Sequence, residues 1–155
     1  MKKTIAFIFA RGGSKGLPLK NQLKLLNHPL IAYSIYIAKI NPSIDDVYVS
    51  TDSEEIANIS IDYGAKIILR PNKLAQDDSP EFLSWKHAIN FLFNQGIYFD
   101  KFISLPPTSP LRSLKDTKIC LDELKSKEEI IITVTPSHRN PWFNMVKKNK
   151  KGLIE

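Results

Sequence analysis

The stretch that decides the fold is TIAFIFARGGSKGLPLKN, residues 4–21. Residues 4–10 form a nearly continuous apolar run, which is typical of a β-strand covered on both faces of a sheet. The segment that follows contains Arg11, Lys15 and Lys20, three glycines, one proline and no acidic residue. Glycines let backbone N–H groups approach an anion closely, and the cations add charge. We therefore interpret this segment as a candidate phosphate-binding arm that follows a buried strand.

Two common phosphate-binding motifs are absent from this arm. Neither the G-x-x-x-x-G-K-[ST] spacing nor the G-x-G-x-x-G spacing occurs in it. Pro18 argues against a helix that begins directly after the glycines, so a helix N-terminus is not the expected anchor. We expect a longer arm that brings Lys20 and Asn21 back over the edge of the sheet. Taken alone, the arm also fits a solvated basic turn.

The rest of the chain alternates between strand-like and helix-like patterns. Further strands are expected at 45–50, 65–70, 101–105 and 129–135, and helices at 29–40, between Asp52 and Gly64, from Ser79 to about Gln95, and at 114–126. This alternation predicts an α/β fold with a mostly parallel sheet and right-handed crossovers. No repeat, low-complexity tract or linker divides the chain, so residues 1–155 are expected to form a single domain.

Local signals predict where the helices begin and end. Asp52, with Glu55 three residues later, predicts an N-cap with a capping box, and Gly64 is placed to end that helix. Ser79 and Ser113 are the expected N-caps of the two later helices.

Three further expectations concern packing and the tail. Pro29 is expected at the first position of its helix. The helix after Ser79 carries an apolar stripe that we assign to the core, made of Phe82, Trp85, Ile89 and Leu92 and broadened by Ala88 and Phe93. Residues 142–155 are expected to form a hairpin with a lysine-rich turn.

The unusual loops all follow strands. They read ARGGSKGLPLKN, TDS, RPNKLAQDDS, PPTSPLRS and PSHRNPWF in chain order. In open parallel sheets, ligands bind beyond the carboxyl ends of the strands, so these loops are expected to meet at one rim. Their convergence predicts a ligand site. Considered singly, Arg70 also fits an ordinary surface arginine, and the loop ending at Arg112 fits a simple connector.

Charge and cysteine content restrict the class of protein. The net charge is +6, and Lys147, Lys148, Lys150 and Lys151 contribute much of the excess. The remaining charge suits a small anionic ligand better than a nucleic acid. The net charge is the only feature of the sequence that supports nucleic-acid binding. The single cysteine fits a reducing, cytoplasmic location. No apolar run approaches the length of a membrane span, and the run at 4–10 is interpreted as a strand rather than a leader peptide.

Four motifs in register resemble one known family. ARGGSKGLPLKN, VSTDSEEIA, LRPNKLAQD and PTSPLR occur in an order and spacing that resemble the acylneuraminate cytidylyltransferase (CMP-sialic acid synthetase) family, from residue 4 to about residue 141. SHRNPWF is similar to a segment of sugar-acid cytidylyltransferases. The resemblance implies a Rossmann-like three-layer nucleotidyltransferase fold. It also implies an enzyme that transfers CMP from CTP to a nine-carbon 2-keto sugar acid and releases pyrophosphate.

The resemblance also assigns roles to individual positions. It implies that Lys20 and Arg11 stabilise charge on the triphosphate. Nucleotide binding is expected of Arg11, Gly12, Gly13, Ser14, Lys15, Lys20, Asn21, Arg70 and Ser79, with Ser79 on the cytosine side. Thr108, Ser109 and Arg112 are expected to face the sugar acid. The family further implies Mg²⁺ as cofactor and a homodimer.

The sequence departs from the family pattern in three places. Pro106 stands where the family has glutamine, which leaves the identity of the sugar acid open. Pro80 and Glu81 replace a segment that usually contains a second serine. The aspartate pair expected to hold Mg²⁺ lies in a region that follows this stretch in the family, so the metal ligands are unassigned and the domain is expected to be incomplete at its carboxyl end. A catalytically inactive CTP-binding module is therefore the alternative, and a cytidylyltransferase for 3-deoxy-octulosonate is a less favoured relative.

Overall fold

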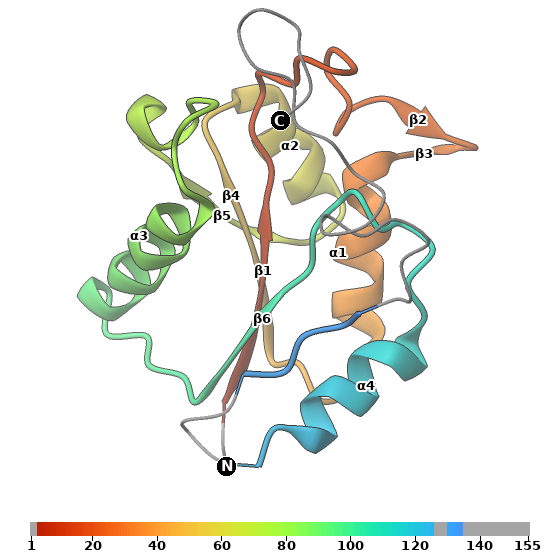
Figure 1. The fold of residues 1–155 in the computed structure, drawn as a ribbon, viewed down its shortest axis with the longest axis vertical. Helices are drawn as coiled ribbons and strands as arrows, with labels where there is room; N and C mark the ends of the chain where they lie inside the picture. The colour runs from red at the N-terminus through yellow and green to blue at the C-terminus, as the bar shows by residue number, and fades with distance from the viewer. Residues whose placement is uncertain (1–2, 126–129, 135–155) are drawn as a thin grey trace, which may run out of the picture.

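The computed structural model describes residues 3–125 and 130–134, and its centre is a parallel four-stranded sheet. The strands are β1 (Thr4–Phe9), β4 (Asp46–Thr51), β5 (Lys66–Leu69) and β6 (Lys101–Ser104), in the order β5-β4-β1-β6 (Figure 1). Because every pairing is parallel, all four strands end at the same edge of the sheet.

Helices cover both faces of this sheet and make three layers. On one face, α1 (Leu30–Ile40) and α2 (Glu54–Asp62) pack against Ala6 and Ile8 of β1. On the other face, Ile5 and Phe7 pack against α3 (Glu81–Asn94), which stands apart from α1 and α4 in Figure 1. The alternation of side chains along β1 therefore supplies both halves of the core. The predicted three-layer α/β architecture is confirmed.

The fourth helix, α4 (Leu114–Glu123), begins where the sequence predicted. Ser113 accepts a hydrogen bond from the Asp116 backbone N–H, and the Asp116 carboxylate accepts one from the Ser113 backbone N–H, which completes a capping box. The helix is tied to α1 by the buried Asn41 side chain, whose Nδ2 donates to Thr117 Oγ1 at 3.1 Å. Gly64 also behaves as expected, because it follows α2 with a positive φ of 79°.

Three local features were not predicted or were placed wrongly. A small hairpin, β2 (Lys24–Leu25) with β3 (His28–Pro29), precedes α1 and was missed. Pro29 therefore pairs with Lys24 and lies just before the helix rather than inside it. A short 3₁₀-helix, η1 (Asn72–Leu74), follows β5.

Two predicted N-caps were wrong because tertiary contacts use the side chains differently. The N-cap of α2 is Ser53, whose Oγ accepts from the Ile56 backbone N–H, whereas the Asp52 carboxylate accepts from the Gly12 backbone. Helix α3 begins after Pro80 and has no side-chain cap, so Ser79 does not fill that role.

The predicted core stripe of α3 was confirmed for Ala88 and Leu92 and was wrong for Phe82 and Phe93. Ser84, Ala88 and Leu92 are the buried residues of the helix, whereas Phe82 and Phe93 are exposed. Ser84 faces inward because of two hydrogen bonds. It accepts one from the Arg70 guanidinium and donates one to the Leu74 carbonyl.

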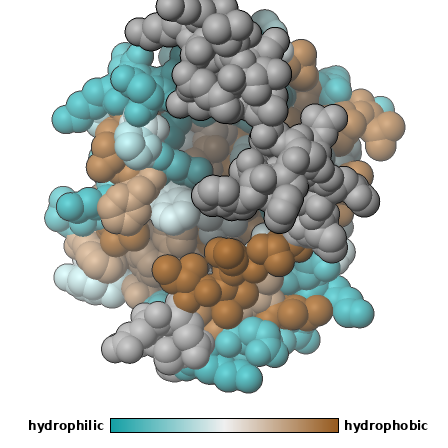
Figure 2. Space-filling view, in the orientation of Figure 1, coloured by the Kyte–Doolittle hydropathy of each residue, from teal (hydrophilic) through white to brown (hydrophobic). Residues whose placement is uncertain are grey.

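The predicted fifth strand is absent over residues 130–134, which have no regular secondary structure. Ile130, Ile132 and Val134 are strongly exposed there. Figure 2 shows apolar side chains gathered on one part of the surface. An apolar run forms a strand only when a neighbouring strand supplies hydrogen bonds, and β6 pairs with β1 alone among the described strands. Residues 129 and 135 of this prediction, the SHRNPWF loop and the predicted hairpin at 142–155 lie outside the described residues.

No helix among the described residues is long and apolar enough to cross a membrane.

Replacement of Asn41 tests the link between α1 and α4. Asn41→Ala is expected to lower the free energy of unfolding by about 1–3 kcal/mol, because Thr117 Oγ1 and the Ser43 backbone N–H each lose a partner. Urea denaturation measures this change. The matched control is Asn90→Ala, an exposed asparagine on α3, which is expected to shift stability by no more than about 0.5 kcal/mol. Equal effects of the two substitutions would contradict the role of Asn41.

Candidate functional site

A polar cavity lies at the carboxyl edge of the sheet. Its volume is about 390 Å³, and it is lined by residues from three loops, those that follow β1, β4 and β5. The lining residues are Arg11, Gly13, Lys15, Asp52, Asn72, Ala75, Gln76 and Asp77. This cavity confirms the prediction that these three loops meet at one rim.

A second hollow, of about 410 Å³, lies beside β5 and has a different character. It is lined by Ala57, Ile61, Ile67, Leu69 and Phe91. All five side chains are apolar, so this hollow offers no group that would recognise an anion. The polar cavity is therefore the candidate functional site.

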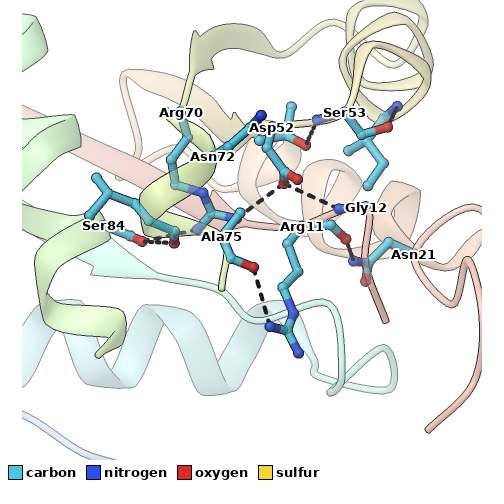
Figure 3. Close-up of polar contacts among 12 residues, drawn as sticks. Arg11, Gly12, Asn21, Asp52, Ser53, Arg70, Asn72, Ala75 and Ser84 are labelled. Carbon is cyan, nitrogen blue, oxygen red and sulfur yellow. Dashed lines mark hydrogen bonds and ion pairs between the residues drawn. The ribbon is translucent and has the colours of Figure 1, made fainter. Parts of the chain in front are cut away.

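Arg11 and Lys15 reach across the cavity to the loop between η1 and α3. Arg11 Nη2 lies 2.6 Å from Asp77 Oδ1, and the Lys15 ammonium pairs with the other oxygen of the same carboxylate. Arg11 Nη1 also donates to the Ala75 carbonyl at 3.3 Å, as Figure 3 shows. Lys15 and Arg11 hold the pKa of Asp77 below its ordinary value. Of the three predicted cations of the arm, Arg11 and Lys15 thus line the site and meet at a single carboxylate.

Behind the cavity, a buried network holds the glycine turn in place (Figure 3). Asp52 Oδ1 accepts from the Gly12 backbone N–H at 3.2 Å and lies 3.6 Å from Arg70 Nη2. Arg70 Nη1 donates to Ser84 Oγ at 3.0 Å. A Cβ atom at Gly12 would lie 3.1 Å from Ser53 Cβ, so a side chain at this position would crowd the close approach of the two loops.

Arg70 is an internal residue rather than a surface arginine. Its side chain is only 6% exposed, and its Nε has no hydrogen-bond partner among the described residues. Burial lowers the pKa of Arg70, and the charge of Asp52 acts in the opposite direction. The geometry therefore places Arg70 behind the cavity wall, where it orients Asp52 and through it Gly12.

Lys20 and Asn21 lie at the end of the arm and differ in their availability. The Asn21 side chain is buried, and its Nδ2 donates to the Arg11 carbonyl at 3.1 Å, which fixes the arm. Lys20 follows Leu19, which has a positive φ of 54° that is strained for a residue other than glycine. Within the described part of the chain, no side chain or carbonyl binds the Lys20 ammonium, so it is available to an anion.

Gly13, Ser14 and Ser79 complete the predicted nucleotide-binding set. Gly13 lines the cavity, and the Ser14 backbone N–H donates to the Gly12 carbonyl in a tight turn. Ser79 lies beside the cavity in sequence but does not line it. Its Oγ is buried, and no partner for it exists among residues 3–125 and 130–134.

Thr108, Ser109 and Arg112 follow β6 and lie on the α1 side of the sheet. Thr108 and Ser109 are exposed, with the Ser109 backbone N–H bonded to the Pro106 carbonyl in a turn. The Arg112 guanidinium donates to Ser34 Oγ at 3.3 Å and to the Pro106 carbonyl at 3.2 Å. These residues do not line the cavity, so the structure does not bring the predicted sugar-acid loop into it.

Sequence reasoning did not assign four residues that line the cavity. Asn72, Ala75, Gln76 and Asp77 all belong to the loop after β5. Their signal was available in the motif LRPNKLAQD, which follows a predicted strand at the same rim.

The described residues do not fit a metal site by themselves. No group of three or more histidine, cysteine, aspartate or glutamate side chains converges among them. Of the two carboxylates in the cavity, Asp77 is bound by two cations, and Asp52 binds Gly12 and Arg70. We therefore assign no chemical step to a metal held by these residues.

Substitution of Asp52 tests the network behind the cavity. Asp52→Asn is expected to lower the free energy of unfolding by about 1–3 kcal/mol, because Arg70 keeps its buried charge but loses its counter-charge. Denaturation by urea is the measurement. Asp62→Asn, an isosteric change at an exposed residue of α2, is the control and is expected to stay within about 0.5 kcal/mol. If both variants are equally stable, the Asp52–Arg70 contact is unimportant.

The lowered pKa of His87 on α3 leads us to expect that the stability of the protein depends on pH. Burial lowers the pKa of His87, the charges of Arg70 and Lys73 lower it further, and its buried Nδ1 has no partner in the described parts of the chain. The unfolded chain therefore binds a proton more readily than the folded protein does, and stability should fall as pH decreases below about 6.5. In His87→Gln this fall should be smaller between pH 7.5 and 5.5, as measured by urea denaturation at each pH. Parallel stability profiles for the two proteins would rule the effect out.

Comparison with known proteins agrees with this geometry. A family model described as Cytidylyltransferase matches residues 5–98, which is more than half of the chain. The chain is 38% identical over 142 residues to N-acylneuraminate cytidylyltransferase of Escherichia coli O18:K1:H7, covering 88% of this chain and 32% of that protein. It is 35% identical over 147 residues to CMP-N,N'-diacetyllegionaminic acid synthase of Legionella pneumophila, covering 93% of this chain and 63% of that protein.

A solved structure shows the same fold. The structure of CMP:2-keto-3-deoxy-manno-octonic acid synthetase complexed with CTP superposes with a TM-score of 0.65 at 23% identity, over 79% of this chain and 47% of that one. The chain thus spans less than two thirds of the length of each of these three proteins. On the evidence of the family model and of these sequence identities, the chain belongs to the cytidylyltransferase family and is homologous to the N-acylneuraminate and related nonulosonic acid cytidylyltransferases.

Proposed function

We propose that this chain carries the nucleotide site of an enzyme that transfers CMP from CTP to a nine-carbon 2-keto sugar acid. The observation that carries the proposal is the cavity in which Arg11, Lys15 and the glycine turn meet at the carboxyl edge of the sheet. This is the edge where parallel α/β sheets bind their ligands, and the cavity belongs to a chain of the cytidylyltransferase family.

In this reaction an oxygen of the sugar attacks the α-phosphorus of CTP. A bond forms between the anomeric oxygen and the α-phosphorus, the bond from that phosphorus to the bridging oxygen breaks, and pyrophosphate leaves with the electron pair. The hydroxyl proton is released. Positioning and stabilisation of negative charge provide most of the catalysis in phosphoryl-type transfer. Such a reaction therefore depends on cations that are free to meet the triphosphate.

The proposed roles follow from where the residues lie. Lys20 does not line the cavity, but no described residue binds its ammonium, and its proposed role is to stabilise the departing pyrophosphate together with Arg11. Within the turn, the Gly13 backbone N–H is offered to the phosphates, because the Gly12 N–H binds Asp52 and the Ser14 N–H binds the Gly12 carbonyl. Lys15 adds charge. Arg70 and Asn21 act by holding that turn, since each is buried and bonded within the protein.

Recognition of the base and of the sugar is assigned to the flanking loops. Ser79 has a buried hydroxyl without a partner in the described structure, which suits a hydrogen bond to cytosine. Thr108, Ser109 and Arg112 are proposed to face the sugar acid. Mg²⁺, which the family implies, would have to be held by groups other than the described carboxylates, as the donor set above does not fit it.

Pyrophosphate release in the presence of CTP and Mg²⁺ tests this function. The candidate acceptors are N-acylneuraminic acid, N,N'-diacetyllegionaminic acid and 2-keto-3-deoxy-manno-octonic acid, which the names of the similar proteins supply. Release with a nine-carbon acid supports the proposal. CTP binding without release with any acid would support the alternative, an inactive CTP-binding module, and release with the octonic acid alone would change the substrate class.

Lys20→Ala separates catalytic charge from folding. This variant is expected to lose about tenfold to a hundredfold in kcat/KM, because a donor to the transition-state charge is removed, while its melting temperature stays unchanged. Lys24→Ala is the matched control: Lys24 lies on β2, is exposed and has no role in the site. If Lys24→Ala loses as much activity as Lys20→Ala, general surface charge rather than Lys20 is responsible.

A further inference from the structure

The Asp77 carboxylate binds the same two cations that are proposed to bind the phosphates of the ligand. Its carboxylate accepts from Arg11 Nη2 at 2.6 Å through one oxygen and pairs with the Lys15 ammonium through the other. These are the two cations of the arm that line the cavity, and Asp77 lines it too. An anionic oxygen between a guanidinium and an ammonium presents the same pattern of acceptors as a phosphate group.

A phosphate cannot take these contacts while Asp77 keeps them. A second nitrogen of the Arg11 guanidinium is also used, because Nη1 donates to the Ala75 carbonyl of the same loop. The loop between η1 and α3 therefore holds Arg11 with both a side chain and a carbonyl. Binding a triphosphate between Arg11 and Lys15 requires these contacts to open.

The loop that carries Asp77 is built to move at low cost. Gln76, Asp77 and Asp78 are all exposed. The Asp77 side chain is 42% exposed and that of Lys15 is 81% exposed, and ion pairs in such positions contribute little to stability. By contrast, the Asp52–Arg70 contact behind the cavity is buried, so opening the loop leaves the glycine turn in place.

We propose that Asp77 is a stand-in for a ligand phosphate, which holds Arg11 and Lys15 in the ligand-free site and is displaced when the triphosphate binds. This inference rests on the proposed function, and it adds a residue that opposes binding instead of supporting it. Asp77 keeps the two cations ordered and neutralised without ligand, and it competes with the ligand for them. Its removal is therefore expected to tighten binding.

Two other roles for Asp77 predict results of a different sign. If Asp77 held a metal ion on the triphosphate, its removal would weaken binding when Mg²⁺ is present. If it served only to order the arm, its removal would weaken binding both with and without Mg²⁺. The direction of the change therefore distinguishes the three roles.

Asp77→Asn is the test, with Asp78→Asn as the matched control. Asn keeps the size of the side chain and removes its charge. Asp78 is the neighbouring exposed acid, and its carboxylate contacts no cation in the described part of the structure, so it reports the effect of loop charge alone. The probes are inorganic tripolyphosphate and CTP, measured by isothermal titration calorimetry with EDTA and then with Mg²⁺.

Asp77→Asn is expected to bind tripolyphosphate about two- to fivefold more tightly than the unchanged protein, the range that a pair of exposed ion pairs allows. Asp78→Asn should change the affinity by less than half as much. The gain should also shrink in the Lys15→Ala background, where one of the two contested contacts is gone. Unchanged or weaker binding by Asp77→Asn overturns the proposal, as does failure of every variant to bind tripolyphosphate.

The two probes keep this inference separate from the proposed function. Tripolyphosphate carries no cytosine, so tighter binding of it by Asp77→Asn supports the stand-in role even if CTP is not a substrate. Conversely, pyrophosphate release from CTP without tighter binding by Asp77→Asn supports the proposed function and rejects the stand-in role.

Discussion

The parallel pairing of β1 with both of its neighbours is the constraint on which the site depends. β1 pairs with β4 on one side and β6 on the other, and β4 pairs with β5. The pairing continues one residue beyond the strands: the Ala10 backbone N–H donates to Ser50, and the Arg70 N–H donates to Thr51. The chain therefore leaves the sheet from adjacent points in three successive loops. A shift of one residue in this register would reverse which face each side chain meets.

Two ion-pair systems lie at this edge of the sheet, Asp52 with Arg70 and Asp77 with Arg11 and Lys15. They differ in burial, and therefore in how much they contribute to the stability of the fold. Arg70 is almost fully buried, so Asp52 offsets the cost of keeping its charge away from water. The same carboxylate binds the Gly12 N–H, and the charge balance of the core is thereby coupled to the shape of the turn. Arg11 and Lys15 are solvated and need no such partner to remain charged. Their pairing with Asp77 consequently contributes little to the fold and bears mainly on the ligand-free site.

The sequence was sufficient to predict the alternating elements and the rim, because these depend on local periodicity and on the rule for parallel sheets. The four strands of the central sheet, the start of α4 at Ser113 and the role of Gly64 are local features and were predicted correctly. The predictions were wrong where a residue distant in sequence determines the role of a side chain. Asp52 resembles an N-cap in sequence, but Gly12 and Arg70 use its carboxylate. Ser84 looks like a solvent-facing serine until the position of Arg70 is known.

The same distinction between local and distant determinants separates the site residues that were predicted from those that were not. Arg11, Gly13 and Lys15 were found because a glycine-rich, basic arm after a strand has a local signature. The cavity-lining residues of the loop after β5 carry a weaker signal, because only the position of the motif LRPNKLAQD after a predicted strand points to them. Only the pairing of β5 with β4 brings that loop to the cavity. The predicted strand at 129–135 failed over residues 130–134 because hydrophobicity alone does not supply a hydrogen-bonding neighbour.

Two loops at the carboxyl edge of the sheet differ in how firmly they are held. On the α1 side, Arg112 and Ser34 both bond to the Pro106 carbonyl, so that this loop is tied to a helix and stiffened by its prolines. On the α3 side, the loop with Asp77 is exposed and is attached to the arm through solvated ion pairs. A loop that is already ordered loses little entropy when it binds a ligand, whereas a loop that must open can make entry depend on the ligand's charge. Under the proposed function, the rigid loop would therefore suit recognition of shape, and the movable loop would suit recognition of a highly charged triphosphate.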